Sequence, residues 1–215
     1  MNTVQPAGVD GSSRSAPYLS IRGLRSSFCG PIDLDLARGE CVPILGRSGS
    51  GKSAFLRLIA DLDPASGEVR LDGRSRDDWP APEWRRRVVY QAAEPAWWAP
   101  DVAAHFQHID PALLGELLPA LGLPLALLRA DIERLSTGER QRLALVRSLT
   151  RQPSVLLLDE PSASLDPAST LAMETVLLGR LAAGTAILIV THSPEQAQRM
   201  SLRRFEMTEG VLRRL

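Results

Sequence analysis

GRSGSGKS, residues 46–53, decides how the rest of this chain is interpreted. The string follows an apolar segment, ECVPIL (residues 40–45), and precedes a segment of helical character, AFLRLIA (residues 54–60). It matches the phosphate-binding pattern G-x-x-x-x-G-K-[ST], which requires this order of strand, glycine-rich loop and helix. The alternative is an ordinary flexible loop, and the flanking strand and helix count against it.

The chemistry that this loop predicts is the binding of a nucleoside triphosphate. Glycines let successive backbone N–H groups converge on phosphate, a lysine reaches the β and γ oxygens, and the following hydroxyl can ligate Mg²⁺. Ser53 is therefore also a predicted metal ligand. The predicted nucleotide-binding residues of the segment are Gly46, Arg47, Ser48, Gly49, Ser50, Gly51, Lys52, Ser53 and Ala54.

Lysine usage supports the same interpretation. Arginine accounts for 24 of the 25 basic residues, so Lys52 is the one lysine of the chain. An ammonium is a compact, rotatable point charge, whereas a guanidinium is a planar fork. In a sequence so biased toward arginine, a lysine is expected at a position that needs the compact ammonium and not the planar guanidinium.

Composition predicts one globular domain and excludes some partners. The 215 residues are 44% hydrophobic and 23% charged, which is ordinary for a soluble protein with one substantial core. The 25 acidic residues balance the 25 basic ones, so no overall field would attract nucleic acid or an anionic membrane. We therefore expect no nucleic-acid partner.

Three further expectations concern the cysteines, the N-terminus and the membrane. Cys29 and Cys41 lie outside any metal-ligand spacing and are expected to be buried thiols. Residues 1–17 are rich in Gly, Ser and Pro, so we expect a disordered tail and not a secretory signal. The longest apolar stretches, residues 155–158 and 186–190, are far shorter than the roughly 20 residues of a membrane helix, so the chain is not expected to span a bilayer.

Hydrophobic periodicity predicts an α/β fold with a small antiparallel β subdomain. Half-exposed strands are expected at residues 19–24, 32–36 and 67–71, the last followed by an Asp72-Gly73 turn. More continuously apolar strands are expected at residues 40–45, 87–91, 155–158 and 186–190, and helices at 54–60, 167–178 and from Pro194. The Leu/Ala-rich residues 92–151, interrupted by prolines, predict a helical subdomain inserted into the core.

Two adjacent carboxylates follow the predicted buried strand at residues 155–158. Such a strand should end beside the phosphate loop, where the metal needs an acidic ligand. Asp159 is the predicted Mg²⁺ ligand, and Glu160 is the predicted group that polarises the attacking water. The alternative role for Asp159, capping a helix, is less attractive because Glu160 and then Pro161 follow it.

The string LSTGERQR, residues 135–142, resembles the signature of the ATP-binding cassette (ABC) family, usually written LSGGQ. With the phosphate loop and the Asp159-Glu160 pair, the chain resembles an ABC-type ATPase from about residue 19 to its end. Thr137 and Glu139 depart from the signature. The resemblance implies a P-loop NTPase with an ABC-type core spanning residues 18–215. It also implies that Ser136 and Gly138 bind the ATP of a neighbouring subunit, in a head-to-tail homodimer or paired cassette.

Other family positions match one by one. Gln91 resembles the glutamine that senses the metal and the γ-phosphate, and the alternative is a solvated strand end. Asp166 resembles the D-loop aspartate, although an ordinary helix cap before Pro167 fits as well. His192 resembles the switch histidine that contacts the γ-phosphate, and the alternative is a core histidine. Phe28 is the candidate platform for adenine, with Tyr18 in its place or a core role for Phe28 as alternatives.

The resemblance implies an ATP-hydrolysing subunit that couples ATP to transport through a separate transmembrane permease. Its expected place is the cytoplasmic face of the cell membrane, held there by the permease, and its size is similar to small bacterial cassettes of the metal (iron) exporter type. Alternatives are a soluble ABC ATPase acting on DNA or the ribosome, a P-loop kinase or GTPase, and a regulatory nucleotide-binding module. The signature, Glu160 and His192 count against the last two.

Adjacent tryptophans follow the predicted metal-sensing glutamine. Neighbouring residues of a strand face opposite sides, and Pro95 and Pro100 make a helix there unfavourable. We therefore expect one of Trp97 and Trp98 at the surface, where it would anchor a helix of the permease. The alternative is that both rings pack between the helical subdomain and the core.

Overall fold

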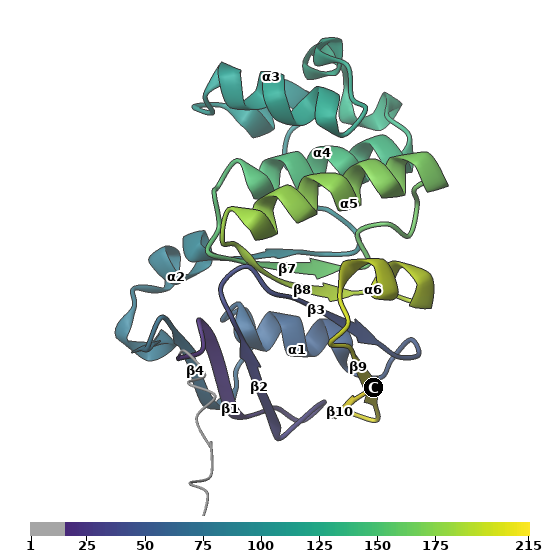
Figure 1. The fold of residues 1–215 in the computed structure, drawn as a ribbon. Helices are drawn as coiled ribbons and strands as arrows, with labels where there is room; N and C mark the ends of the chain where they lie inside the picture. Colours follow the sequence, from purple (N-terminus) through teal and green to yellow (C-terminus); the bar gives the residue numbers. More distant parts are fainter. Residues whose placement is uncertain (1–15) are drawn as a thin grey trace, which may run out of the picture.

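The computed structural model describes residues 16–215, and the predicted tail lies almost wholly outside this range. The chain forms two β-sheets with a helix between them, and further helices cover the far face of the larger sheet (Figure 1). This is the α/β architecture that the hydrophobic periodicity predicts. Within the described residues, no helix has the length and apolar character needed to cross a membrane.

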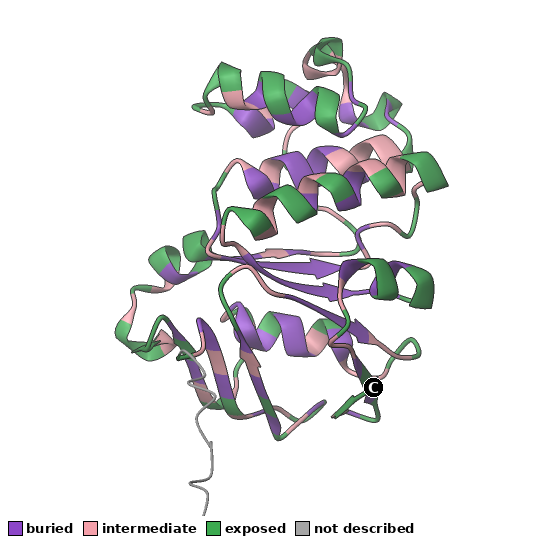
Figure 2. Cartoon of the chain, in the orientation of Figure 1, coloured by how far each residue is buried: buried purple, intermediate pink, exposed green. Residues whose placement is uncertain are grey.

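The larger sheet has six strands in the order β10-β9-β3-β8-β7-β6. The strands β3, β8, β7 and β6 run parallel to their neighbours, β9 is parallel to β3, and β10 closes the edge as an antiparallel hairpin. Every residue of β7 and β8 is buried, as Figure 2 shows for the centre of the sheet. Strands covered on both faces are apolar without alternation, which explains the runs VLLLD and AILIV. The strands are β3 (Cys41–Leu45), β6 (Val88–Gln91), β7 (Val155–Asp159), β8 (Ala186–Val190), β9 (Phe205–Thr208) and β10 (Val211–Arg214).

The smaller sheet is antiparallel, with the order β2-β1-β4-β5. Its strands alternate between buried and more exposed residues because one face packs on the core. The predicted Asp72-Gly73 turn is present and pairs Leu71 with Arg74. The strands are β1 (Leu19–Arg25), β2 (Ile32–Leu36), β4 (Ser66–Leu71) and β5 (Arg74–Ser75).

The helix that follows the glycine loop, α1 (Lys52–Ile59), lies between the two sheets (Figure 1). Its buried Phe55, Leu56 and Ile59 belong to one hydrophobic cluster with residues of both sheets. On the other face, α4 (Thr137–Leu149) and α5 (Pro167–Ala182) cover the sheet, and α3 (Pro111–Ala120) lies outside them (Figure 1). Two short helices, α2 (Ala81–Arg87) and α6 (Pro194–Met200), complete the set.

Residues 92–151 are helical for most of their length, and three of their elements are short 3₁₀ helices. These are Val102–Phe106, Leu125–Arg129 and Ile132–Arg134. A second hydrophobic cluster runs without a break from Leu117 of α3 through Leu145 of α4 to Leu156 and Ile187 of the sheet. The packing is thus continuous with the core, and an independent helical subdomain over residues 92–151 stays a prediction.

Several predicted boundaries were wrong by a few residues, for local reasons. The first helix starts at Lys52, because Gly51 (φ 103°) takes the left-handed conformation that turns the loop directly into the helix. The strand expected at residues 87–91 starts at Val88, since Arg87 still belongs to α2. The helix expected to end at residue 178 continues to Ala182.

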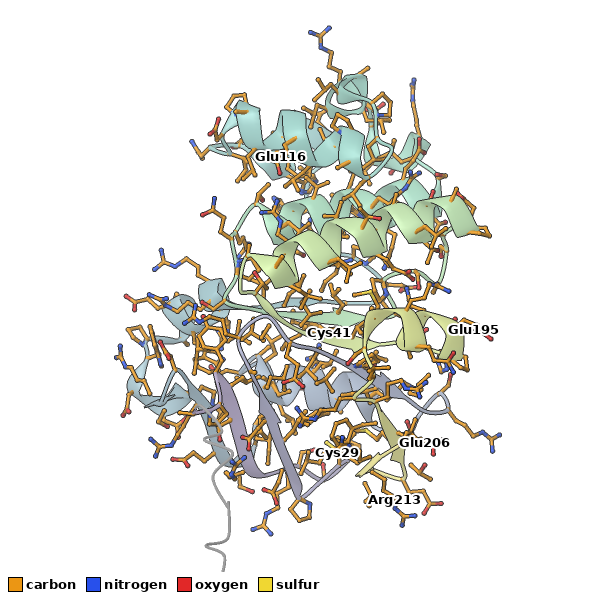
Figure 3. All side chains as sticks on the ribbon, in the orientation of Figure 1. Cys29, Cys41, Glu116, Glu195, Glu206 and Arg213 are labelled. Carbon is orange, nitrogen blue, oxygen red and sulfur yellow. The ribbon has the colours of Figure 1, made fainter. Side chains whose placement is uncertain are left out.

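Both cysteines are free and buried, as expected, and they lie on separate parts of the core (Figure 3). Burial raises the pKa of the Cys41 thiol to about 12, with the charge of Glu40 adding to the effect. Burial also raises the pKa of Cys29. Neither thiol therefore carries the thiolate that nucleophilic or metal chemistry needs near neutral pH.

The contact between α2 and the end of α1 gives a test of the core. Trp84 is fully buried, and its indole N–H donates to the Ile59 carbonyl at 3.0 Å. Trp84→Phe leaves that carbonyl without its donor, so we expect a loss of about 1–3 kcal/mol in the free energy of unfolding, measured by urea denaturation. The matched control is Trp79→Phe, because the Trp79 N–H is buried without an acceptor among the described residues. Equal losses in the two variants would contradict the assignment.

Candidate functional site

The glycine loop connects β3 to α1 and has the backbone that its glycines permit. Gly46 has φ 143°, and a Cβ there would lie 2.3 Å from the Met207 carbonyl oxygen of β9. Gly51 has φ 103°, and a Cβ there would lie 3.3 Å from the side chains of Cys29 and Met207. A side chain at Gly46 would therefore displace the loop, which explains why the pattern needs glycine there.

Lys52 folds back over the loop that it ends. Its side chain is 4% exposed, and Nζ donates to the carbonyls of Gly46 and Arg47 at 2.7 and 2.8 Å. Burial lowers the pKa of Lys52, while the negative charges of Glu160 and Asp159 oppose that change. An ammonium has three donors, so one remains for a phosphate beside the loop.

Asp159 ends β7, and only one of its carboxylate oxygens is paired. The residue is 2% exposed, and its Oδ2 accepts a hydrogen bond from the Tyr90 hydroxyl at 3.0 Å. Its Oδ1 is buried without a partner within residues 16–215, and the same holds for both amide atoms of Gln91. Buried polar atoms are normally paired, so these atoms mark a position suited to a polar or charged ligand.

Glu160 has an unusual backbone at the end of β7. Its φ is 47°, in the left-handed region, and its N–H donates to the Val190 carbonyl of β8 at 3.0 Å. Left-handed backbone is uncommon for a residue with a side chain and is concentrated at functional sites. Gln141 of α4 also approaches the Glu160 carbonyl, at 3.5 Å.

The structure brings Glu160 and His192 together. Oε1 of Glu160 and Nε2 of His192 are 2.7 Å apart, and both side chains are partly exposed. The alternative of a core histidine is therefore wrong, and the two predicted catalytic residues form a pair.

Two neighbouring depressions meet at Glu160. The first, of about 430 Å³, is lined by Phe28 and by loop residues that include Lys52 and Ser53. The second, of about 400 Å³, is lined by Ser162, His192 and Ser193. Glu160 lines both, so a group bound at the loop would have the carboxylate and the histidine at its far end.

Phe28 is exposed and not part of the core. Its exposed fraction is 78%, and its ring lines the same depression as Lys52. Tyr18, the alternative platform, is buried under the Arg38 guanidinium and lines a separate hollow. Of the alternatives that the sequence left open, the structure therefore favours Phe28 as the aromatic surface beside the loop.

The signature residues lie apart from the loop of the same chain. Ser136 caps α4: its Oγ accepts from the Glu139 N–H at 3.2 Å, and Glu139 accepts from the Ser136 N–H at 2.9 Å. The Ser136 hydroxyl, which donates to the Glu139 carboxylate at 2.8 Å, and the Ser136 N–H together hold the pKa of Glu139 below its usual range. A Cβ on Gly138 would lie 3.0 Å from the Ser164 carbonyl, so the signature helix packs on the D-loop. The S-x-x-E spacing could have predicted this capping box from the sequence.

Asp166 has the ordinary role that the sequence left open. Its carboxylate accepts from the N–H and the hydroxyl of Ser169, at 2.8 and 2.7 Å, and so caps α5. These hydrogen bonds lower its pKa. The cap is present, and a nucleotide contact by Asp166 stays a prediction.

Sequence reasoning missed Tyr90 altogether. No local pattern marks this residue, because its partner Asp159 is 69 residues away. Burial raises the pKa of Tyr90, with the charge of Asp159 as the next cause, so its hydroxyl stays protonated as a donor. Only the pairing of β6 with β7 places the two side chains together.

A family model described as "ABC transporter" matches residues 29–163. The chain belongs to the ABC transporter family. It is 40% identical over 189 residues to an aliphatic sulfonates import ATP-binding protein of Nocardia farcinica, covering 84% of this chain and 74% of that protein. It is 35% identical over 208 residues to the lipoprotein-releasing system ATP-binding protein of Myxococcus xanthus, covering 88% and 92%.

The fold agrees with a solved ABC cassette. A dimeric ATP-binding cassette in a post-hydrolysis state, bound to ADP and Pi, superposes with a TM-score of 0.75 at 21% identity, covering 92% of this chain and 98% of that one. These similarities confirm the predicted fold and family. They also confirm the function that the sequence predicted for this ABC protein, an ATP-binding and ATP-hydrolysing transporter subunit.

The packing of Lys52 predicts that Lys52→Arg is disabling although it conserves charge. A planar fork cannot occupy the buried space where Nζ reaches both loop carbonyls. We expect ATP affinity, measured by calorimetry, to fall by about ten-fold or more, as the loss of one charge-assisted hydrogen bond implies. Arg57→Lys, on the exposed side of α1, is the control and should bind ATP as the wild type does. Unaltered affinity in Lys52→Arg would show that the lone lysine is incidental.

Proposed function

We propose that this ABC subunit hydrolyses Mg²⁺-ATP at a site shared by two copies and thereby drives a separate membrane-spanning permease. The observation that carries the proposal is the 2.7 Å pair of Glu160 and His192 beside the phosphate loop. A carboxylate within reach of a bound γ-phosphate can polarise water, and the histidine fixes that carboxylate while its own ring faces the same depression.

The residues present fit a magnesium ion. Ser53 supplies a hydroxyl at the start of α1, Asp159 has a free Oδ1, and Gln91 has an unpaired amide oxygen. Residues 16–215 contain no group of three or more His, Cys, Asp or Glu side chains that could hold a metal. That agrees with Mg²⁺, which is usually bound by one or two carboxylates together with substrate phosphates. When bound, the ion would neutralise charge on the β- and γ-phosphates.

Each remaining step falls to residues of this chain. Lys52 and the N–H groups of the loop bind the phosphates, and Phe28 packs against the base. Glu160 accepts a proton from the attacking water through one of its carboxylate oxygens. The His192 ring lies 2.7 Å from the other oxygen and limits the orientations open to the carboxylate. To exclude bulk water from the reaction, a second surface must cover the open depression beside the phosphate loop.

A second copy of the chain supplies that surface in this proposal. Ser136 and Gly138 are absent from the lining of the loop depression within one chain. The capping box uses the Ser136 and Glu139 N–H groups at the start of α4, so in this proposal the N–H groups of Thr137 and Gly138 are the donors for an anion. The solved cassette bound to ADP and Pi is dimeric, which supports the pairing of two copies.

Glu160→Gln separates binding from hydrolysis. The amide keeps the size of the side chain but cannot accept the water proton, so we expect turnover to fall by about 10²-fold or more. ATP should then hold two copies together, measured as a dimer by light scattering at saturating ATP. Glu116→Gln, on the exposed side of α3, is the matched control and should hydrolyse ATP at the wild-type rate. A monomeric Glu160→Gln variant with wild-type turnover would refute the proposal.

A groove between α4 and the Gln91 edge of the sheet is the proposed docking site of the permease. It encloses about 300 Å³ and is lined by apolar residues such as Leu62 and Val89, together with three arginines, Arg85, Arg147 and Arg151. None of the residues that line it is acidic. A short cytoplasmic segment with apolar residues and a carboxylate would complement this lining. The subunit would then lie at the membrane through its permease alone.

The tryptophan pair divides as the sequence predicted. Trp98 is 67% exposed and lines the groove, whereas Trp97 is half-buried with its indole N–H inside the protein. The Arg147 guanidinium lies 4.6 and 4.8 Å from the two ring centres and donates to the Ala96 carbonyl, so it holds the loop in place. Trp98 is therefore the candidate anchor, and Trp97 is the structural member of the pair.

Single substitutions test this division. Trp98→Ala should change the free energy of unfolding by less than about 0.5 kcal/mol, because the ring is mostly exposed. Trp97→Ala should cost about 2 kcal/mol, roughly half the cost of a fully buried aromatic. Only Trp98→Ala should keep basal ATPase activity and lose stimulation by membrane vesicles from the source cells. Full stimulation of Trp98→Ala by those vesicles would contradict the docking proposal.

A further inference from the structure

The hydroxyl of Tyr90 has no part in the chemistry described so far, yet it contacts the predicted metal ligand. Tyr90 pairs with Leu157 in the parallel ladder between β6 and β7, so Asp159 lies two residues further along the neighbouring strand. Residues two apart in a strand share a face, and this face packs on α1. The diagonal offset is within reach of a long aromatic side chain.

The hydrogen bond gives the two oxygens of the Asp159 carboxylate different surroundings. Oδ2 accepts the Tyr90 hydroxyl at 3.0 Å, and Oδ1 is left buried and unpaired in the part of the chain that the structure describes. The torsion that turns an aspartate carboxylate is broad and roughly two-fold, so a carboxylate without a fixed partner samples many orientations. A donor on one oxygen removes that freedom and fixes the direction of the other.

Tyr90 is the only side chain that donates to Asp159 within residues 16–215. Arg57 of α1, whose charge acts on Tyr90, is bound to Asp63 through two hydrogen bonds of 2.7 Å. Lys52 donates to the carbonyls of its own loop. Neither basic side chain therefore replaces the tyrosine as the group that orients the carboxylate.

We propose that Tyr90 is a positioning residue of the nucleotide site, whose hydroxyl holds Oδ2 of Asp159 so that Oδ1 faces the magnesium ion. The inference rests on the proposed Mg²⁺-dependent function and adds a residue to it. Hydrogen-bond partners of metal ligands fix the ligand's orientation, and their removal typically lowers metal affinity by about 10–100-fold. The ring of Tyr90 packs against the core and is expected to stay there in a phenylalanine variant.

The test measures metal-linked nucleotide binding in the full-length protein. Tyr90→Phe removes one oxygen atom and keeps the ring. Binding of a non-hydrolysable ATP analogue is measured by calorimetry in EDTA and across a Mg²⁺ titration. We expect unchanged affinity in EDTA, within about two-fold, and about a ten-fold rise in the Mg²⁺ concentration that gives half-maximal tightening. Tyr18→Phe, which alters the other tyrosine of the chain, should match the wild type in both conditions.

A merely structural role for Tyr90 predicts other outcomes. Equal weakening with and without Mg²⁺ would mean that the variant disturbs the loop as a whole, and wild-type behaviour in both conditions would mean that the hydroxyl is incidental. Either result overturns the inference. If binding of the analogue to the wild type does not depend on Mg²⁺, the proposed metal role fails. That result distinguishes a failure of the proposed function from a failure of the Tyr90 inference alone.

A double-mutant cycle with Asp159→Asn gives an independent check. If Tyr90 acts through the Asp159 carboxylate, Tyr90→Phe should cause no further change in Mg²⁺ dependence once that carboxylate is replaced. Additive effects of the two substitutions would show that Tyr90 acts by another route and would overturn the inference. Thermal unfolding of each variant confirms that the fold is kept, because the isosteric change leaves the packing of the ring intact.

Discussion

The parallel pairing of β3, β8 and β7 is the constraint on which the site depends. Parallel neighbours end at the same edge of a sheet, and ligands of such sheets bind outside that edge. Here the glycine loop follows β3, Asp159 and Glu160 end β7, and His192 follows β8. Lys52 and His192, which are 140 positions apart in the sequence, thus border neighbouring depressions that meet at Glu160.

The same edge carries the least favourable local features of the fold. Asp159 Oδ1, the Gln91 amide and the Ser50 hydroxyl are buried without partners among the described residues, and Glu160 has left-handed backbone. Each such feature costs free energy in the absence of a ligand. The fully buried strands β7 and β8 beneath them offset that cost through apolar burial. Their grouping at one edge is what a site prepared for a charged ligand requires.

The sequence predicted those parts of the site that local patterns encode. The glycine loop, the Asp159-Glu160 pair and the signature are each contiguous, and their chemistry follows from residue type and spacing. The two-fold alternation of β1 and β2 and the apolar runs of β7 and β8 likewise follow from burial on one face or on both. Helix ends were less accurate: α5 runs four residues beyond the expected Leu178, because Gly179 stays helical and the left-handed glycine after the helix is Gly184 (φ 96°).

Contacts that depend on strand register were beyond sequence reasoning. Tyr90 meets Asp159 only because β6 pairs with β7 in one register, and a shift by one residue would turn the tyrosine to the opposite face. The 2.7 Å approach of Glu160 to His192 likewise depends on the parallel pairing of β7 with β8, since the two residues follow those strands. Pairing across a sheet is set by the whole core, so it cannot be read from either strand alone.

Strand β6 links the two surfaces that the proposals concern. Tyr90 and Gln91 both line the groove beside Trp98, and the same two residues reach the metal side through the Asp159 contact and the unpaired amide. A partner segment in the groove would therefore touch the strand whose last residues shape the nucleotide site, with no intervening loop to absorb a displacement. Packed strands have discrete arrangements and do not deform continuously. The proposed docking groove and the proposed metal site thus share one rigid element, strand β6.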